Sequence, residues 1–178
     1  MHKERKSCRL SNYDYSSEGI YYVTLCTKDR SLFFGRILDS KISYSEIGLI
    51  AQQYWLEIPI HFKHVKLDDF IVMPNHIHGI LNLDYSKVGT HHGMAPQPNQ
   101  FSRPVKNSVS VIINQYKSSV KRWCNKNGFE CFNWQPRFYD NIVRNDDSLD
   151  RIREYINYNI LNWEDDDLFH LDSDNSRE

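Results

Sequence analysis

Alternating apolar and polar residues in the N-terminal half of the chain are typical of strands interrupted by one helix. Residues 19–27 (GIYYVTLCT) are rich in β-branched and aromatic side chains and predict a strand. Residues 37–44 indicate a weaker strand or hairpin arm. Ser45 can then cap a helix that runs towards Ile58, with Pro59 at or near its end.

Residues 67–83 (LDDFIVMPNHIHGILNL) contain two apolar runs around Met73-Pro74-Asn75. Because proline has no N–H to donate to a neighbouring strand, we expect a bend, a bulge or an edge position there. The second run begins with two histidines. Residues 84–106 have little regular pattern and contain several glycines and prolines, which predicts a long mobile loop.

Helical spacing follows in the C-terminal half. One long amphipathic helix, for which Gly128 is the expected end, is predicted by Val109, Ile112, Ile113, Tyr116, Val120 and Trp123. Residues 138–144 predict another strand. Asp146 or Asp147 can cap a last helix, whose apolar stripe is Leu149, Ile152, Ile156, Ile160 and Trp163. This order of elements predicts an α+β fold, a ferredoxin-like sandwich with helices on one face of a largely antiparallel sheet.

The chain has 178 residues, of which 40% are hydrophobic, enough for one good core and too few for two. We therefore expect a single domain over residues 1–163 and an acidic, disordered tail over residues 164–178. The chain has no apolar run of about 18 residues and no apolar stretch at its start, so we expect a cytoplasmic protein with no membrane partner. No C-x-x-C spacing links the four cysteines, which are expected to be free thiols: Cys8, Cys26, Cys124 and Cys131.

Charge is distributed unevenly, although the net charge is only -1. Residues 164–178 contain seven acidic side chains and one basic side chain, so the rest of the chain carries +5. Residues 101–126 contain six basic side chains and no acidic one, which suits a phosphate backbone but is equally typical of a solvated helix. The candidate DNA contacts are Arg103, Lys106, Lys117, Lys121, Arg122 and, further along, Arg144.

His76 and His78 are separated by one residue within a predicted strand, so both imidazoles project from the same face of the sheet. Two imidazoles can supply two ligands to a divalent metal and leave open positions for substrate oxygens, as a catalytic site requires. Spacing alone favours the alternative, in which two half-buried histidines hydrogen-bond to their neighbours.

The last predicted helix favours the metal site over two structural histidines. At roughly 100° per residue, Tyr155 and Asn159 lie one turn apart on the flank of the apolar stripe, whereas Tyr158 points nearly opposite the stripe, towards solvent. A tyrosine and an amide at this border can reach over the sheet face that carries the histidines. Tyr155 is therefore a candidate nucleophile and Asn159 a candidate third ligand. The alternative is that Tyr155 is only a boundary core residue.

Four segments together resemble the single-tyrosine HUH transposases, and most of all the REP-associated tyrosine transposases. These segments are 72–80 (VMPNHIHGI), 134–137 (WQPR), 139–144 (YDNIVR) and 154–159 (EYINYN). Residues 19–24, with Arg30 and Phe33, fit the opening strand of that family, so the resemblance covers roughly residues 9–163. The sequence departs from the family at Ile160, where proline is frequent, and in the long segment 84–106.

This resemblance implies a ferredoxin-like core, usually dimeric, so a homodimer is expected. It implies that His76, His78 and Asn159 bind Mg²⁺ or Mn²⁺, which helps a phenol with a pKa of about 10 to act as a nucleophile. The implied activity is cleavage and rejoining of single-stranded or hairpin DNA, such as REP-like palindromes, through a 5′-phosphotyrosine on Tyr155. Trp123 or Trp134 could stack on DNA bases, but both are more simply core residues.

Three other functions fit the same residues. An HUH nicking enzyme of replication or conjugation would share the metal site and differ in the DNA that it cleaves. A domesticated transposase would bind palindromic DNA without turnover. A metal-dependent phosphoesterase would use water in place of tyrosine and form no covalent intermediate.

Overall fold

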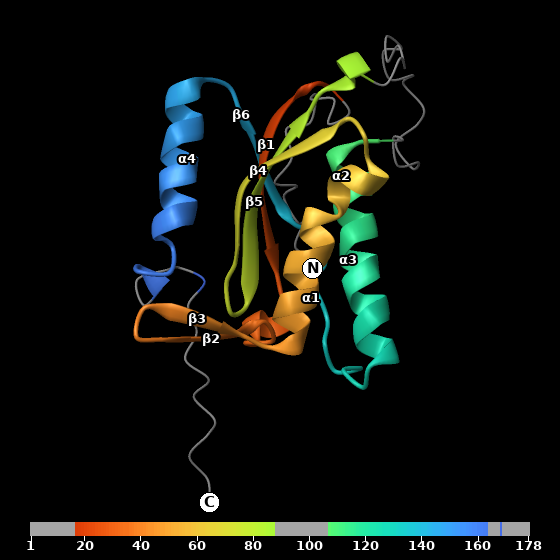
Figure 1. Ribbon diagram of the computed structural model, residues 1–178, viewed down its shortest axis with the longest axis vertical. Helices are drawn as coiled ribbons and strands as arrows, with labels where there is room; N and C mark the ends of the chain where they lie inside the picture. Colours follow the sequence, from red (N-terminus) through yellow and green to blue (C-terminus); the bar gives the residue numbers. More distant parts are fainter. Residues whose placement is uncertain (1–16, 88–106, 164–167, 169–178) are drawn as a thin grey trace, which may run out of the picture.

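The computed structural model describes residues 17–87, 107–163 and 168. Its centre is an antiparallel sheet with the strand order β4-β5-β1-β6 (Figure 1). The strands are β1 (Gly19–Cys26), β4 (Val65–Val72), β5 (His76–Leu83) and β6 (Tyr139–Val143). A separate hairpin consists of β2 (Gly35–Leu38) and β3 (Lys41–Tyr44). The predicted α+β, ferredoxin-like fold class is confirmed.

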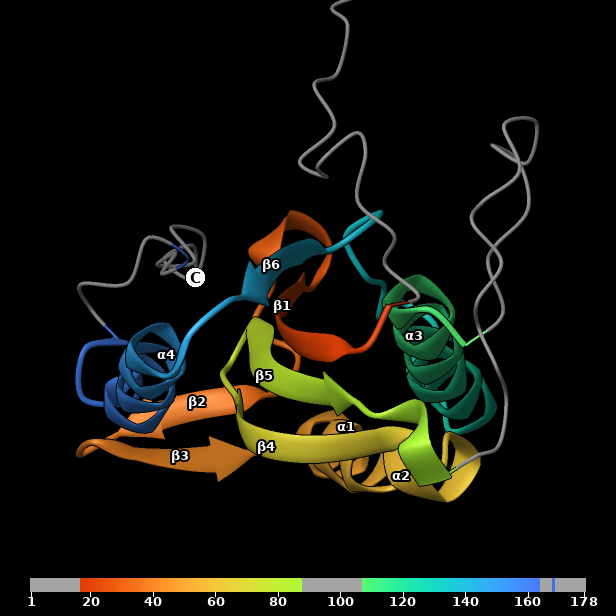
Figure 2. The ribbon, with the colours of Figure 1, turned by 90° about the horizontal axis from the view of Figure 1, so that it is seen from above.

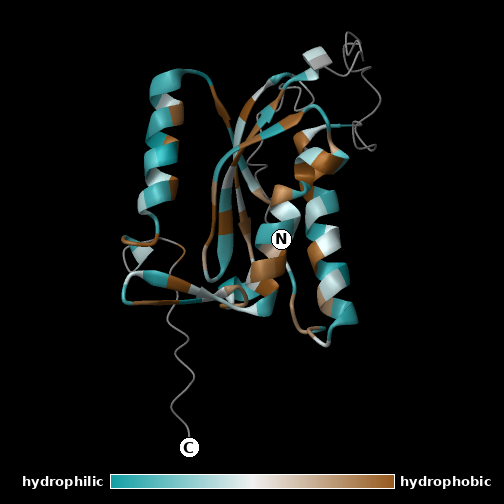
Figure 3. Cartoon of the chain, viewed as in Figure 1, coloured by the Kyte–Doolittle hydropathy of each residue, from teal (hydrophilic) through white to brown (hydrophobic). Residues whose placement is uncertain are grey.

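Helices cover both faces of the sheet (Figure 2). α1 (Glu46–Leu56), α2 (Ile58–His61) and α3 (Val109–Lys126) lie on one face, and α4 (Asp146–Tyr158) lies on the other. The prediction that the helices share one face is therefore wrong. α4 takes the second face because its buried residues, Leu149 and Ile156, pack against Ile80, which lies outside the large core. The remainder of α4 is mostly hydrophilic (Figure 3).

The starts of the helices follow from side-chain caps. Ser45 caps α1, as predicted, by accepting a hydrogen bond from a backbone N–H of the first turn. α4 is capped by Asn145, whose side chain accepts a hydrogen bond from the N–H of Ser148 at 2.9 Å. The prediction of Asp146 or Asp147 at this cap is wrong, and both lie inside the first turn instead.

The ends of the helices differ in part from the predicted ones. α4 ends at Tyr158, so Ile160 and Trp163 lie beyond the regular helix, where the prediction had included them. Pro59 lies in the first turn of the short α2, a position where its missing N–H costs no helical hydrogen bond. Gly128 follows α3 with a φ of 85° and marks the end of that helix, as predicted.

The turn between β4 and β5 fixes where the histidine strand begins. The N–H of Met73 donates to the carbonyl of His76 at 2.8 Å, with Pro74 inside the turn, where no N–H is needed. Thr27 donates to the carbonyl of Asn75 from both its N–H and its hydroxyl, at 2.9 and 3.0 Å. The predicted bend is confirmed, and it is tied to the end of β1.

Some predictions concern residues outside the described part of the chain. These are the loop beyond residue 87, Arg103, Lys106, Cys8 and nearly all of the acidic tail. Of the cysteines within that part, Cys26, Cys124 and Cys131 are free thiols, and only Cys124 is buried. No helix within the described ranges has the length and apolar character needed to cross a membrane.

A glycine in β5 allows close packing between the sheet and α1. Trp55 is fully buried and lies against Gly79, where an added Cβ would collide with three atoms of the indole ring. The indole is held on its other sides by Phe70 and Tyr116, with ring centroids 5.9 and 5.2 Å away. The indole therefore has little room to move.

Gly79→Ala should destabilise the fold by roughly 1–3 kcal/mol, the usual cost of overpacking a core. Urea unfolding followed by circular dichroism measures this difference. The double variant Gly79→Ala/Trp55→Phe should recover part of the loss, because a phenyl ring lacks the indole atoms that the Cβ meets. An unfolding midpoint for Gly79→Ala equal to that of the wild type would contradict the close approach.

Candidate active site

The sheet face covered by α4 carries both histidines. β5 lies antiparallel to β1, with His76 opposite Cys26 and His78 opposite Thr24, while Ile77 enters the large core on the other face. The two imidazole rings lie edge to face, with centroids 4.4 Å apart. Both are buried, at 0% and 3% exposure. They share one face, as the H-x-H spacing predicts.

Asn75 determines the tautomer of His76. The Asn75 amide nitrogen donates to the carbonyl of Leu168 at 2.8 Å, so its oxygen is the atom that lies 2.7 Å from His76 Nδ1. Because an amide oxygen only accepts, Nδ1 carries the proton and Nε2 keeps a lone pair. Burial, followed by the charges of His78 and Arg30, holds the pKa of His76 well below its ordinary value. The ring is therefore neutral, the form that binds metals.

His78 is held by two hydroxyl groups and faces the candidate nucleophile. Its Nδ1 lies 2.7 Å from the hydroxyl of Tyr22 and 2.9 Å from that of Thr24. Its Nε2 lies 3.4 Å from the hydroxyl of Tyr155, and the two ring centroids are 5.2 Å apart. The hydroxyls thus orient the imidazole so that Nε2 is directed at α4.

α4 carries Tyr155, and Asn159 follows one turn later. Asn159 comes directly after the last residue of α4 but keeps a helical φ of -59° and ψ of -35°, so the absence of proline at Ile160 does not take it out of register with Tyr155. Tyr155 is 44% exposed, whereas Asn159 is 1% exposed. Tyr158 is 51% exposed, in agreement with its predicted direction. The phenol is therefore open to solvent, and the amide is enclosed.

Two acidic residues at an irregularity in β4 hold α4 in place. The β4–β5 register shifts around Asp68 and Asp69, as it does at a β-bulge. The guanidinium of Arg153 donates two hydrogen bonds to Asp68, at 3.0 and 2.6 Å, and the amide of Asn157 donates to Asp69 at 2.9 Å. Because these bonds lie on either side of Tyr155 in the sequence, they fix the helix along the edge of the sheet.

The residues present fit a divalent metal with nitrogen and oxygen ligands. His76 Nε2 is buried and has no hydrogen-bond partner within the described ranges, so its lone pair is available. An amide oxygen such as that of Asn159 is a ligand that Mg²⁺ and Mn²⁺ accept. The described residues contain no group of three or more His, Cys, Asp or Glu side chains that could hold a metal. Within the described ranges, a third protein ligand would therefore be of another type, as Asn159 is.

The basic residues of α3 lie across the sheet from the histidines. The amino group of Lys117 donates to the carbonyls of Gln135 and Arg137 at 2.7 and 2.8 Å, and burial lowers its pKa to about 8. Lys121 donates to two further carbonyls of the segment between α3 and β6. Both lysines hold this segment against the helix. Their contacts with DNA stay predictions.

The two tryptophans considered as base-stacking residues pack against the large core. Trp123 stacks on Phe129, with ring centroids 5.8 Å apart. Trp134 donates to the carbonyl of Lys117 at 3.0 Å and contacts the ring of Phe34. Both are partly buried at the edge of the core, in line with the simpler interpretation, and their stacking on DNA bases stays a prediction.

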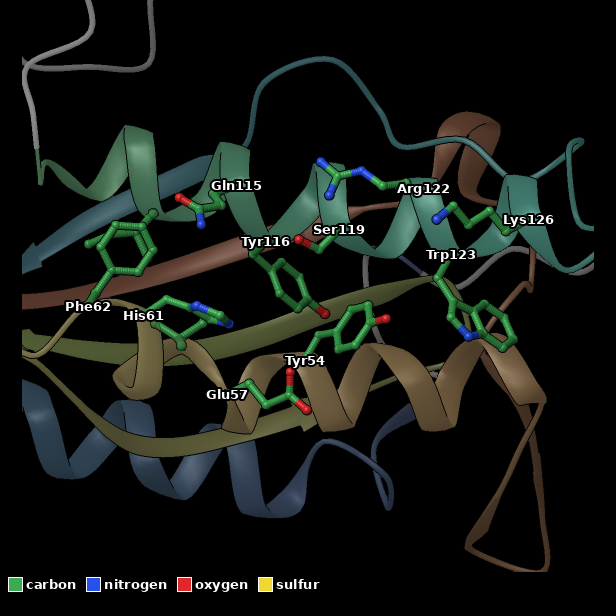
Figure 4. Close-up of a pocket in the computed structure, with 12 residues that line it drawn as sticks. Tyr54, Glu57, His61, Phe62, Gln115, Tyr116, Ser119, Arg122, Trp123 and Lys126 are labelled. Carbon is green, nitrogen blue, oxygen red and sulfur yellow. The ribbon is translucent and has the colours of Figure 1, made fainter.

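A cavity of about 440 Å³ opens between α1 and α3 (Figure 4). Among the residues that line it are Tyr54 from α1, Glu57 between α1 and α2, and Arg122 and Lys126 from α3. The cavity shares no residue with the candidate active site, which lies under α4. Of the remaining predicted DNA contacts, Arg122 thus lines this cavity, and Arg144 is exposed directly after β6.

Sequence reasoning missed the residues that orient the site. Tyr22 and Thr24 could have been found from the sequence, because side chains alternate along the strand at residues 19–27 and these two therefore project from the same face of the sheet. Asn75 directly precedes the histidine that it orients. Asp68 had no local signal, since its partner Arg153 is 85 residues away.

The fold is similar to that of a solved structure of a REP-associated tyrosine transposase bound to a REP hairpin. The two chains align with a TM-score of 0.57 and 18% identity, over 86% of this chain and 74% of that one. The resemblance to REP-associated tyrosine transposases is confirmed at the level of the fold.

Sequence comparison adds a relative across nearly the whole chain. A Haemophilus influenzae protein, described as uncharacterized, is 35% identical over 169 residues, which cover 93% of each chain. This chain and the Haemophilus protein belong to one family. No family model matches the chain.

Asp68→Asn should weaken the attachment of α4 in a pH-dependent way. The hydrogen bonds from Arg153 hold the pKa of Asp68 below its ordinary value, so the pair stabilises the folded chain above the ordinary aspartate pKa of about 3.9. This contribution is lost as the pH falls through the lowered pKa. The urea midpoint of the wild type should therefore exceed that of Asp68→Asn at pH 7 and approach it in acid.

Asp150→Asn provides the matched control for this ion pair. Asp150 also contacts Arg153, at 3.1 Å, but its side chain is 72% exposed, so the same change should have a smaller effect at pH 7. A difference between wild type and Asp68→Asn that stays constant with pH would contradict the assignment.

Proposed function

We propose that this protein is a DNA transposase that cleaves and rejoins single-stranded or hairpin DNA through a 5′-phosphotyrosine on Tyr155. The observation that carries the proposal is the 3.4 Å distance between the Tyr155 hydroxyl and Nε2 of His78, beside the buried ring of His76. DNA as the substrate is supported by the fold, which is shared with a transposase bound to a REP hairpin. Tyr155 and His78 belong to one chain, so a second copy is not needed to bring them together.

The proposed reaction exchanges one phosphodiester bond for another. The Tyr155 hydroxyl oxygen forms a bond to the phosphorus of the scissile phosphate, and the bond from phosphorus to the 3′-oxygen breaks. The phenol loses its proton as the new bond forms, and the departing 3′-oxygen takes up a proton to become a 3′-hydroxyl. Because the phosphotyrosine retains the phosphodiester energy, a 3′-hydroxyl of another strand can reverse the exchange without ATP.

The chain itself contributes orientation to this reaction. Tyr22 and Thr24 hold the ring of His78, and α4 holds the phenol of Tyr155 against it. The exposure of Tyr155 allows a DNA strand to reach the phenol from solvent. Positioning of this kind accounts for much of the catalysis of phosphoryl transfer by proteins.

Mg²⁺ or Mn²⁺ is the proposed cofactor, with His76 Nε2, His78 Nε2 and the amide oxygen of Asn159 as ligands. When bound, such a cation withdraws charge from the phosphate and assists attack by a phenol. The lowered pKa of His76 supports the assignment, because the neutral ring need not lose a proton to bind metal.

Tyr155→Phe should abolish the covalent adduct, because the variant lacks the attacking oxygen. A labelled hairpin oligonucleotide with single-stranded flanks is incubated with protein and Mn²⁺ and resolved on a denaturing gel. Tyr158→Phe is the matched control and should keep the adduct. Binding of the hairpin by Tyr155→Phe should be unchanged, since the ring remains.

Two of the rival functions, and the failure of Tyr155 as the nucleophile, have their own outcomes in this experiment. An adduct that survives Tyr155→Phe would reject Tyr155 as the nucleophile. Cleavage without any adduct in the wild type would indicate a phosphoesterase, with water as the nucleophile. Tight hairpin binding without cleavage would indicate a DNA-binding protein without turnover.

Removal of the metal with a chelator should stop adduct formation, and Mn²⁺ should restore it. His76→Ala should slow adduct formation at least about 100-fold, as expected for loss of a ligand to a catalytic metal. Electron paramagnetic resonance of Mn²⁺ measures binding independently of activity and should show weaker binding for His76→Ala. His61→Ala, on α2, is the histidine control. Equal Mn²⁺ binding by wild type and His76→Ala would remove His76 from the ligand set.

A further inference from the structure

We propose that Tyr139 and Asn141 on β6 form a subsite for a nucleobase next to the scissile phosphate. This inference rests on the proposed function, because it extends the site of Tyr155 along the same sheet face. The ligand is a base of the DNA strand whose phosphate lies at the histidines.

The strand register connects Tyr139 to the histidines. β6 pairs with β1 so that Tyr139 lies opposite Thr24, and Thr24 in turn lies opposite His78. The hydroxyl of Thr24 is 2.9 Å from the imidazole of His78, so both project from the α4 face. Residues opposite one another on neighbouring strands project from the same face. Tyr139 therefore stands in one row with Thr24 and His78, two strands or about 10 Å from the histidine.

Tyr139 is exposed in spite of its large aromatic ring. The residue is 62% exposed and belongs to neither hydrophobic cluster. Within residues 17–87, 107–163 and 168, no hydrogen bond or ring contact involves its side chain. β6 is also an edge strand of the sheet. A single exposed tyrosine is ordinary on a protein surface. Tyr139 is assigned to the nucleobase subsite because it stands in one row with Thr24 and His78.

Both side chains suit a base better than a phosphate. An aromatic ring on an open sheet is a stacking platform for unpaired bases, and such stacking tolerates different sequences. Asn141 lies two residues along β6, opposite Tyr22, is exposed, and carries an amide that can donate to and accept from a base edge. Asp140, between them, is 8% exposed and lies on the other face, so its charge does not oppose the strand.

The test separates binding from chemistry. Tyr155→Phe protein, which should form no adduct, is mixed with a labelled hairpin oligonucleotide that has single-stranded flanks, and fluorescence anisotropy measures binding at a fixed salt concentration. Adding Tyr139→Ala should weaken binding about tenfold, the effect of losing one stacked base. Tyr139→Phe should bind like the parent, because the ring is kept. Tyr158→Ala removes an exposed tyrosine outside the row and should also bind like the parent.

Two more measurements exclude an effect on folding. Tyr139→Leu retains an apolar side chain without an aromatic ring and should lose binding as Tyr139→Ala does, with an unchanged Tm. In protein that retains Tyr155, Tyr139→Ala should raise the DNA concentration needed for half-maximal adduct formation about tenfold and leave the rate at saturation near that of the wild type.

Equal binding by Tyr139→Leu and the parent would overturn the subsite, and so would a loss of binding in Tyr139→Phe as large as in Tyr139→Ala. Failure of the proposed function is distinguishable from both results. If the wild type forms no adduct but Tyr139→Ala still weakens binding, Tyr155 is rejected as the nucleophile and the nucleobase subsite stands.

Discussion

The packing of α4 against the histidine face of the sheet is the contact on which the candidate site depends. In its apolar part, Leu149 and Ile156 of the helix are buried against Ile80, with further partly buried apolar side chains around them. The polar part, from Arg153 and its neighbours to the edge of β4, adds a second attachment of the helix. Without α4 the sheet would present two imidazoles, and with it a phenol lies 3.4 Å from one of them.

One face of the sheet carries the large apolar core, and the other carries the polar candidate site. The large core lies between the sheet and α1 and α3, and it contains most of the buried apolar residues of the described chain. The α4 face carries polar side chains at positions where an ordinary sheet would continue its core, including Thr24 and both histidines. Such a face gains less from burial. The apolar core on the opposite face, which includes Trp55, stabilises the sheet that carries this polar site.

Strong local patterns made part of this fold predictable. β1, α3 and the proline turn before β5 follow from periodicity and backbone chemistry. The side of the sheet that α4 occupies does not follow from the sequence. An apolar stripe shows that a helix packs on another element, but it does not show which face of the sheet that is. His78 and Tyr155 were predictable because strand and helix periods determine side-chain direction, and a family resemblance joined them across 77 residues. The hydrogen bonds of Lys117 were not predictable, because the sequence of a basic helix does not show whether its amino groups bind water or backbone carbonyls.

Asn75 links two parts of the chain that are 93 residues apart through one amide group. The amide oxygen of Asn75 determines which nitrogen of His76 carries the proton, and its amide nitrogen donates a hydrogen bond to the carbonyl of Leu168. If the backbone at Leu168 moves, the amide becomes free to rotate, and its NH₂ group can then face Nδ1. His76 would exchange tautomers and present a proton where it had presented a lone pair. The backbone at Leu168 and the imidazole of His76 are thus coupled through the orientation of a single side chain.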